Sequence, residues 1–137
     1  MTIGAGCLCG AVRIALAEPP FAARSCWCRA CQYLASGGST NSVFVRTEGM
    51  TVTGEIRWYR RVADSGSRIE RGFCPVCGTP LMARDADHPE RAAVRIGALD
   101  DPGLLAPQSV IWTGSAPAWA CIDPALPQTA GQPAPIG

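Results

Sequence analysis

Residues 74–78 read Cys74-Pro75-Val76-Cys77-Gly78, and this pentapeptide is the strongest structural signal in the chain. Pro75 restricts φ early in the turn, and Gly78 can adopt the left-handed conformation that wraps backbone N–H groups around the two sulfurs. A close pair of cysteines of this kind is typical of a zinc knuckle, which supplies half of a tetrahedral site. The pentapeptide therefore predicts a turn held by metal, with a second pair of ligands from elsewhere in the chain.

Cys7-Leu8-Cys9 is the candidate for that second pair. In an extended segment, residues two apart point to the same side, so both sulfurs can face one ion. Together with Cys74 and Cys77 the pair makes a closed four-thiolate site, which is the form expected of a structural zinc.

A third group of cysteines, at Cys26, Cys28 and Cys31, supplies three further ligands. Three protein ligands leave one position open, and an open position distinguishes a catalytic zinc from a structural one. A second structural zinc and a redox-active thiol cluster remain alternatives for this group. We interpret these groups as metal ligands rather than disulfide partners, because nothing in the sequence indicates an oxidising compartment.

The bulk composition bounds the remaining function classes. The chain has 137 residues, a formal net charge of +1 and only 17% charged residues, which suits one domain over residues 1–137 and gives no reason to expect nucleic acid as a partner. The sequence contains no apolar run of about 18 residues, so a membrane span is not expected. The N-terminal residues lack the basic and apolar regions of a signal peptide, so the expected location is the cytoplasm.

The hydrophobic pattern predicts a mainly β fold with one short helix. Alternation of apolar and other residues, and clusters of β-branched residues, predict strands near 12–16, 41–46, 50–53, 57–62, 68–73, 92–96 and 109–112. The helix is expected over about 29–36, with Gly37 placed to end it. Residues 1–122 form the expected core, and the Pro-rich tail at 123–137 is expected to lie extended over the surface.

Four motifs occur in a fixed order along this chain. They are Gly6-Cys7-Leu8-Cys9-Gly10, Cys26-Trp27-Cys28-Arg29-Ala30-Cys31, Gly72-Phe73-Cys74-Pro75-Val76-Cys77-Gly78 and Gly97-Ala98-Leu99-Asp100-Asp101-Pro102. This order resembles the family of glutathione-dependent formaldehyde-activating enzymes and centromere protein V, over residues 6 to about 127. The resemblance implies a β-tent fold and two zinc ions per chain, the structural one on Cys7, Cys9, Cys74 and Cys77 and the catalytic one on Cys26, Cys28 and Cys31.

The resemblance also implies carbon–sulfur lyase activity, in which formaldehyde and glutathione are joined as S-hydroxymethylglutathione or released from it. The expected partner is thus a small thiol or thiol adduct. An arginine near the three-cysteine group could offset its negative charge and bind a glutathione carboxylate. The candidates are Arg24, Arg29, Arg57, Arg60, Arg61, Arg68 and Arg71. The Arg-rich stretch at 57–71 is either a solvated face or an anion-binding one.

Several single residues carry two interpretations. Trp27 stands where many members of the family have His; it is expected to pack inward, the alternative being the rim of the pocket. Cys121 is expected to be a small buried core residue, or else a thiol near the catalytic zinc. His88 is expected in a polar surface loop. The tryptophans expected in the core are Trp58, Trp112 and Trp119.

Three function classes follow from these observations. The leading one is a zinc-dependent carbon–sulfur lyase acting on a small thiol adduct. The second is a zinc-stabilised binding module without catalysis, and the third is a thiol redox or metal-handling protein. A pocket over Cys26, Cys28 and Cys31 would favour the first class.

Overall fold

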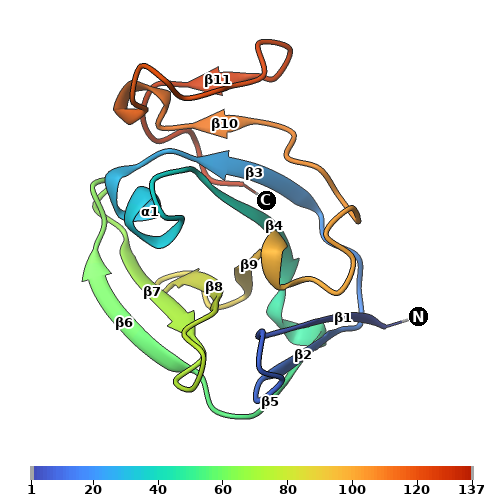
Figure 1. Cartoon of the computed structure of the whole chain (residues 1–137). Coiled ribbons are helices and arrows are strands. Elements are labelled where there is room, and N and C mark those ends of the chain that lie inside the picture. The colour runs from blue at the N-terminus through green and yellow to red at the C-terminus, as the bar shows by residue number, and fades with distance from the viewer. Residues whose placement is uncertain (1, 137) are drawn as a thin grey trace.

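The computed structural model describes residues 2–136, which fold into two β-sheets and one α-helix (Figure 1). The small sheet has three strands in the order β1-β2-β5, namely β1 (Ile3–Gly6), β2 (Arg13–Leu16) and β5 (Met50–Thr53). The large sheet has eight strands in the order β11-β10-β3-β4-β9-β8-β7-β6. They are β3 (Ala22–Cys26), β4 (Thr40–Arg46), β6 (Arg57–Val62), β7 (Arg68–Phe73), β8 (Pro80–Asp85), β9 (Arg91–Arg95), β10 (Val110–Ile111) and β11 (Gln128–Thr129).

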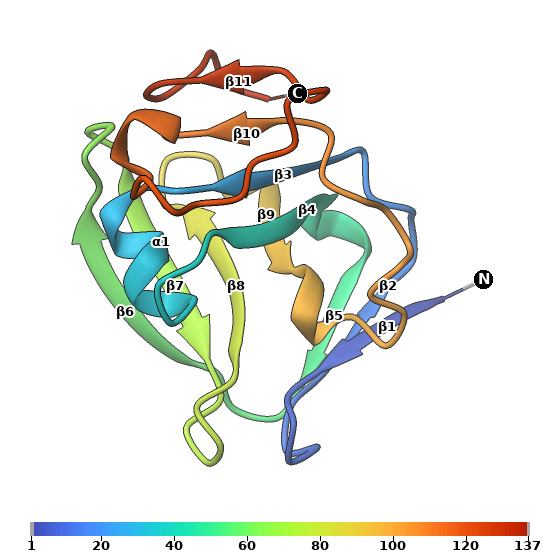
Figure 2. The same cartoon turned by 45° about the horizontal axis from the view of Figure 1, so that its top comes forward.

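The large sheet is strongly curved, and the helix α1 (Arg29–Leu34) lies within its curve in both views (Figures 1 and 2). Three short 3₁₀ helices complete the fold: η1 (Thr47–Gly49), η2 (Ile96–Ala98) and η3 (Thr113–Ser115). The mainly β, single-domain architecture with one short helix is the one that the sequence predicts. In residues 2–136 there is no helix with the length and apolar character needed to cross a membrane.

The two faces of the large sheet have different roles, because side chains alternate along each strand. One face packs against the small sheet, where buried Ile14 and Leu16 meet Val43, Val45 and Val94. This contact forms the hydrophobic core of the protein. The residues between these core positions point to the opposite face, and that face carries the polar cavity described below.

The expected hairpin at 57–62 and 68–73 is present as β6 and β7, paired from Arg57↔Phe73 to Val62↔Arg68. Four strands were not expected from the sequence: β1, β3, β8 and β11. β3 reads Ala-Ala-Arg-Ser-Cys and lacks β-branched residues, so its strand conformation depends on pairing with β4 and β10 rather than on local preference.

Two expectations about buried residues are wrong. Cys121 is exposed rather than in the core, and Trp119 is 71% exposed. Both lie in the irregular segment after η3, which has no regular pairing that would carry them into the interior. Trp58 and Trp112 are half-buried. Trp27 is buried at 6% exposure, as the inward-packing interpretation expects.

Candidate functional site

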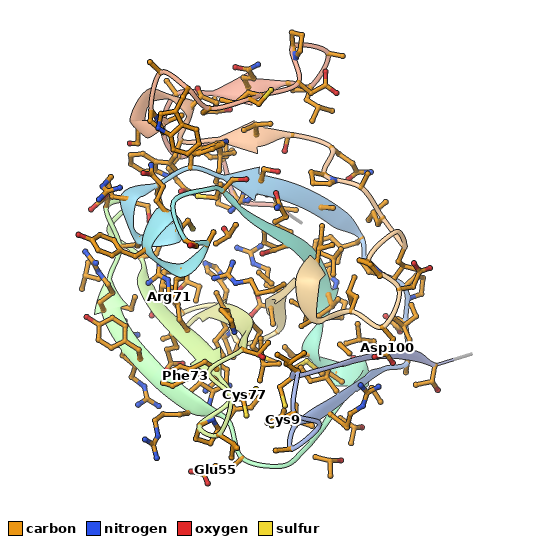
Figure 3. All side chains as sticks on the ribbon, in the orientation of Figure 1. Cys9, Glu55, Arg71, Phe73, Cys77 and Asp100 are labelled. Carbon is orange, nitrogen blue, oxygen red and sulfur yellow. The ribbon has the colours of Figure 1, made fainter. Side chains whose placement is uncertain are left out.

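The two hairpin tips that carry Cys7 and Cys9, and Cys74 and Cys77, meet at one point. The first tip joins β1 to β2 in the small sheet, and the second joins β7 to β8 in the large sheet. All four sulfurs lie within 4.8 Å of one another, with Cys7 Sγ 3.6 Å from Cys9 Sγ and Cys9 Sγ 3.8 Å from Cys74 Sγ. Figure 3 shows the side chains of Cys9 and Cys77 next to each other across the gap between the tips. The cluster therefore joins the two sheets.

Backbone amides are directed at these sulfurs. The N–H of Val12 donates to Cys7 Sγ at 3.2 Å, and the N–H groups of Val76 and Cys77 donate to Cys74 Sγ at 3.4 and 3.5 Å. Gly78 has φ +77°, the left-handed conformation that the pentapeptide predicts. Donors arranged in this way stabilise thiolates, and thiolates are the form of cysteine that binds metal.

The three-cysteine cluster is built where β3 passes into α1. Cys26 is the last residue of β3, Cys28 is the N-cap of α1 and Cys31 lies in its first turn. The three sulfurs lie within 4.8 Å of one another. The N–H of Cys28 donates to Cys26 Sγ at 3.5 Å, and the N–H of Cys31 donates to Cys28 Sγ at 3.4 Å. Hydrogen bonds from the Cys26 and Cys28 thiols lower the pKa of Cys31 to about 2.

Buried Gln32 holds this turn in place through two hydrogen bonds. Its Nε2 donates to the carbonyl of Trp27 at 2.8 Å and to the carbonyl of Ser115 at 3.0 Å. Trp27 packs edge-on against Trp119, with ring centroids 6.3 Å apart. The Gln32 hydrogen bond and the Trp119 contact therefore hold the segment between the first two cysteines. Trp27 is not among the residues that line the cavity.

A cavity of about 400 Å³ lies beside the three-cysteine cluster, and Cys26, Cys28 and Cys31 all line it. None of the four cysteines at the hairpin tips does. Its floor is the face of the large sheet opposite the hydrophobic core, with Ser42 on β4 and small Ala83 and Ala93 on β8 and β9. The volume is in the range of small-molecule sites.

Arginines dominate the charge of this cavity. The five that line it are Arg24, Arg71, Arg84, Arg91 and Arg95, whereas its lining carboxylates are Asp64 and Asp85. Of the seven arginines proposed from the sequence, only Arg24 and Arg71 line the cavity. Arg29 instead donates to Gln32 Oε1 at 2.6 Å, and Arg68 pairs with Asp87. Arg57, Arg60 and Arg61 are exposed on β6.

Sequence reasoning missed Arg84, Arg91 and Arg95, and it placed His88 in a surface loop without a role. His88 is in a loop, but it also lines the cavity, and its Nδ1 lies 3.3 Å from Glu90 Oε1. The alternation in Arg91-Ala-Ala-Val-Arg95 does put Arg95 opposite the apolar Ala92 and Val94. The sequence alone does not reveal that the face carrying Arg95 is the wall of a cavity.

Both clusters fit a tetrahedral metal ion. Zinc–sulfur bonds of roughly 2.3 Å in tetrahedral array separate the sulfurs by about 3.8 Å. The two sulfur–sulfur distances at the hairpin tips, 3.6 and 3.8 Å, match this value. The thiolate donor set suits zinc or another thiophilic ion rather than magnesium or calcium. The first cluster offers four ligands and the second offers three beside an open cavity.

Comparison with known proteins bears on the fold and on the family of the chain. A crystal structure of a protein from Rhodobacter sphaeroides superimposes with a TM-score of 0.55 at 22% sequence identity, covering 71% of this chain and 87% of that one. At this identity the likeness bears on the fold alone. No curated protein sequence matches the chain. The family model described as glutathione-dependent formaldehyde-activating enzyme matches residues 2–115, and the chain thus belongs to this family.

Proposed function

We propose that the protein is a zinc-dependent carbon–sulfur lyase that acts on a small thiol adduct such as S-hydroxymethylglutathione. The observation that carries the proposal is the contrast between the two clusters. Cys26, Cys28 and Cys31 line a cavity of about 400 Å³, whereas the four cysteines at the hairpin tips do not. Family membership supports the reaction class. A cavity of this size favours a small-molecule ligand over the binding-module alternative.

In this proposal, Cys7, Cys9, Cys74 and Cys77 hold a structural zinc, and Cys26, Cys28 and Cys31 hold a second zinc whose fourth position faces the cavity. Zinc at the second site would supply an acidic centre at which an incoming thiol binds as its thiolate. The protein's own residues fix the three sulfurs through the β3–α1 turn, with Gln32 holding that turn in place. Trp27 has only an N–H donor and is buried, so it neither ligates metal nor transfers protons.

The reaction cleaves the bond between sulfur and the hydroxymethyl carbon. The electron pair of that bond goes to sulfur, and the hydroxyl proton is lost as the carbonyl of formaldehyde forms. His88 is the one histidine of the chain, and it lines the cavity. A neutral imidazole has a nitrogen that can accept a proton, so His88 is our candidate acceptor for the proton of the hydroxyl group.

The proposal is tested by measuring exchange between glutathione, formaldehyde and their adduct with ¹³C-labelled formaldehyde, by NMR at equilibrium. The zinc-loaded protein should accelerate exchange above the spontaneous rate, and Cys28→Ser should abolish the acceleration. Cys121→Ser is the matched control, because it removes an exposed thiol that does not line the cavity. Acceleration that survives in Cys28→Ser, or is absent from the native protein, would refute the proposal.

A further inference from the structure

Two arginines in the cavity have guanidinium nitrogens that lack partners. Arg71 is only 8% exposed, yet among residues 2–136 its Nε and Nη1 have no hydrogen-bond acceptor. Arg95 donates from Nη1 to Ser42 Oγ at 2.9 Å, but its buried Nε has no acceptor in the same part of the chain. A buried charged donor without a partner costs free energy, so such groups in a cavity point to a ligand that completes them.

The strand register brings these two side chains to the same floor. Ile69 and Arg71 share the cavity face of β7, and Ala93 and Arg95 share that of β9. Arg71 is paired with Ala83, and Ala83 with Ala93, so the neighbours of Arg71 on β8 and β9 in this row carry only methyl side chains. Figure 3 labels Arg71 on its strand. Small residues at these positions leave room for a ligand between the two guanidinium groups.

Two of the other three cavity arginines already have hydrogen-bond acceptors, and the third, Arg24, lies over the ring of Phe44. Arg84 donates from Nε to Glu70 Oε1 at 2.9 Å and stacks over the ring of Trp58. Hydrogen bonds from Arg60 and Arg84 lower the pKa of Glu70, so this carboxylate is charged and neutralises Arg84. Arg91 donates to the carbonyl of Ile136. Arg71 and Arg95 therefore differ from the other cavity arginines in having buried guanidinium nitrogens without an acceptor among residues 2–136.

The charge balance of the cavity leads to the same conclusion. The five arginines that line the cavity outnumber its negative charges, which are Asp64, Asp85 and the one net negative charge of three thiolates around a divalent ion. Cys31, Arg71 and Arg95 all line this one cavity. Buried charge is retained when it is paired, so the cavity needs an anionic ligand in addition to the thiolates.

We propose that Arg71 and Arg95 form an anion subsite in the cavity, and that it binds a carboxylate carried by the thiol ligand. The inference rests on the proposed function, since it assigns the substrate class of the same site: thiols that bear a carboxylate. Arg71 and Arg95 then determine specificity by offering planar N–H donors that match a carboxylate. A neutral thiol of the same size leaves both donors unpaired and binds more weakly.

The test compares 3-mercaptopropionate with 3-mercapto-1-propanol, two thiols of nearly equal size, by calorimetric titration of the zinc-loaded protein. The acid should bind at least about tenfold more tightly than the alcohol, the factor expected for a charge-assisted hydrogen bond. Arg71→Met and Arg95→Met should each remove most of this preference while leaving the alcohol's affinity unchanged. Arg46→Met is the matched control, because Arg46 is exposed, stacks on Phe21 and does not line the cavity.

Folding is monitored in each variant by its melting temperature. Because replacing an unpaired buried charge with an apolar side chain is often neutral or stabilising, both variants should melt at or above the temperature of the native protein. Equal affinity for the two thiols, or a preference that persists in both variants, would overturn the anion subsite and leave the proposed lyase intact.

A thiol-free acid separates the two proposals. Propionate added to ¹⁵N-labelled, zinc-loaded protein should shift the Nε–H resonance of Arg71, which is identified by its loss in Arg71→Met. If neither thiol binds and this shift persists, the subsite stands and the thiol chemistry fails. If the shift is also absent, both proposals fail.

Discussion

At the scale of single residues, Trp27 illustrates how a departure from a family pattern can be explained by packing. Its side chain is 6% exposed and meets Trp119 edge-on, while its carbonyl accepts a hydrogen bond from Gln32. The cysteines on either side of it face the cavity. This position therefore contributes to the support behind the cluster rather than to ligand contact.

Trp27→His should lower stability without changing thiol preference. The smaller imidazole leaves a void and a buried polar ring, which together cost about 2–4 kcal/mol. Melting temperature and the affinities for the two mercapto compounds above provide the measurement. Trp119→His is a control of the same chemistry at a position 71% exposed, where the loss should be small. A stable Trp27→His protein with altered thiol preference would place Trp27 in the ligand site.

Cys74→Ser should unfold the protein or make it aggregate. Cys74 is fully buried, accepts two backbone hydrogen bonds and belongs to the cluster that joins the sheets. Serine is a poor ligand for zinc, so the free energy of metal binding is lost from folding. Circular dichroism and size-exclusion chromatography compare it with Cys28→Ser, which should remain folded. Equal thermal stability of the two variants would contradict distinct roles for the two clusters.

At the scale of elements, turns with positive φ set the register of the sheets. Gly54 follows β5 with φ +95°, and a Cβ there would lie 2.1 Å from the carbonyl oxygen of Ala11. Gly78 has φ +77°, but a Cβ there would have no heavy atom within 4 Å. Both glycines thus have the left-handed conformation, but only Gly54 lacks room for a Cβ atom.

Gly54→Ala should be much more destabilising than Gly78→Ala. The second substitution adds only the strain of a left-handed alanine, about 1–2 kcal/mol, whereas the first adds a clash with backbone that cannot move without opening the β1–β2 hairpin. Urea unfolding of the zinc-loaded variants measures the loss in free energy of unfolding for each, and the m-value, the dependence of that free energy on urea concentration, should not change. Similar losses in the two variants would mean that the Ala11 turn is free to shift.

Local pattern is sufficient for some elements and insufficient for others. The hairpin of β6 and β7 was predictable because Arg, Trp, Tyr and Val flank a Gly-containing turn. β8 reads Pro-Leu-Met-Ala-Arg-Asp, which has no strong strand preference, and it is a strand because β7 and β9 pair with it on both sides. Such pairing is a long-range property and leaves no local trace in the sequence.

At the scale of the whole molecule, the same distinction divides the candidate site. Both cysteine clusters could be predicted from spacing, because metal ligands occur in close pairs within short segments. The cavity could not, because its floor comes from alternate residues of several strands. Arg71 and Arg95 are on neither the same hairpin nor adjacent strands, and only the order β9-β8-β7 brings them together. His88, in the loop between β8 and β9, lines the same cavity.

The two clusters should also differ in how they release metal. We expect about two zinc ions per chain, one on each cluster. The four-thiolate cluster lies between the small and large sheets, so releasing its ion requires the hairpin tips to separate, which is part of unfolding. The three-thiolate cluster borders the cavity, so a chelator can enter and take the open coordination position. A chelator with a colorimetric zinc indicator should therefore remove one zinc quickly while the near-native circular dichroism is kept, and the other only as the spectrum is lost. Cys28→Ser should abolish the fast phase and leave the slow one. A single phase that removes both ions together with the fold would mean that both clusters are structural.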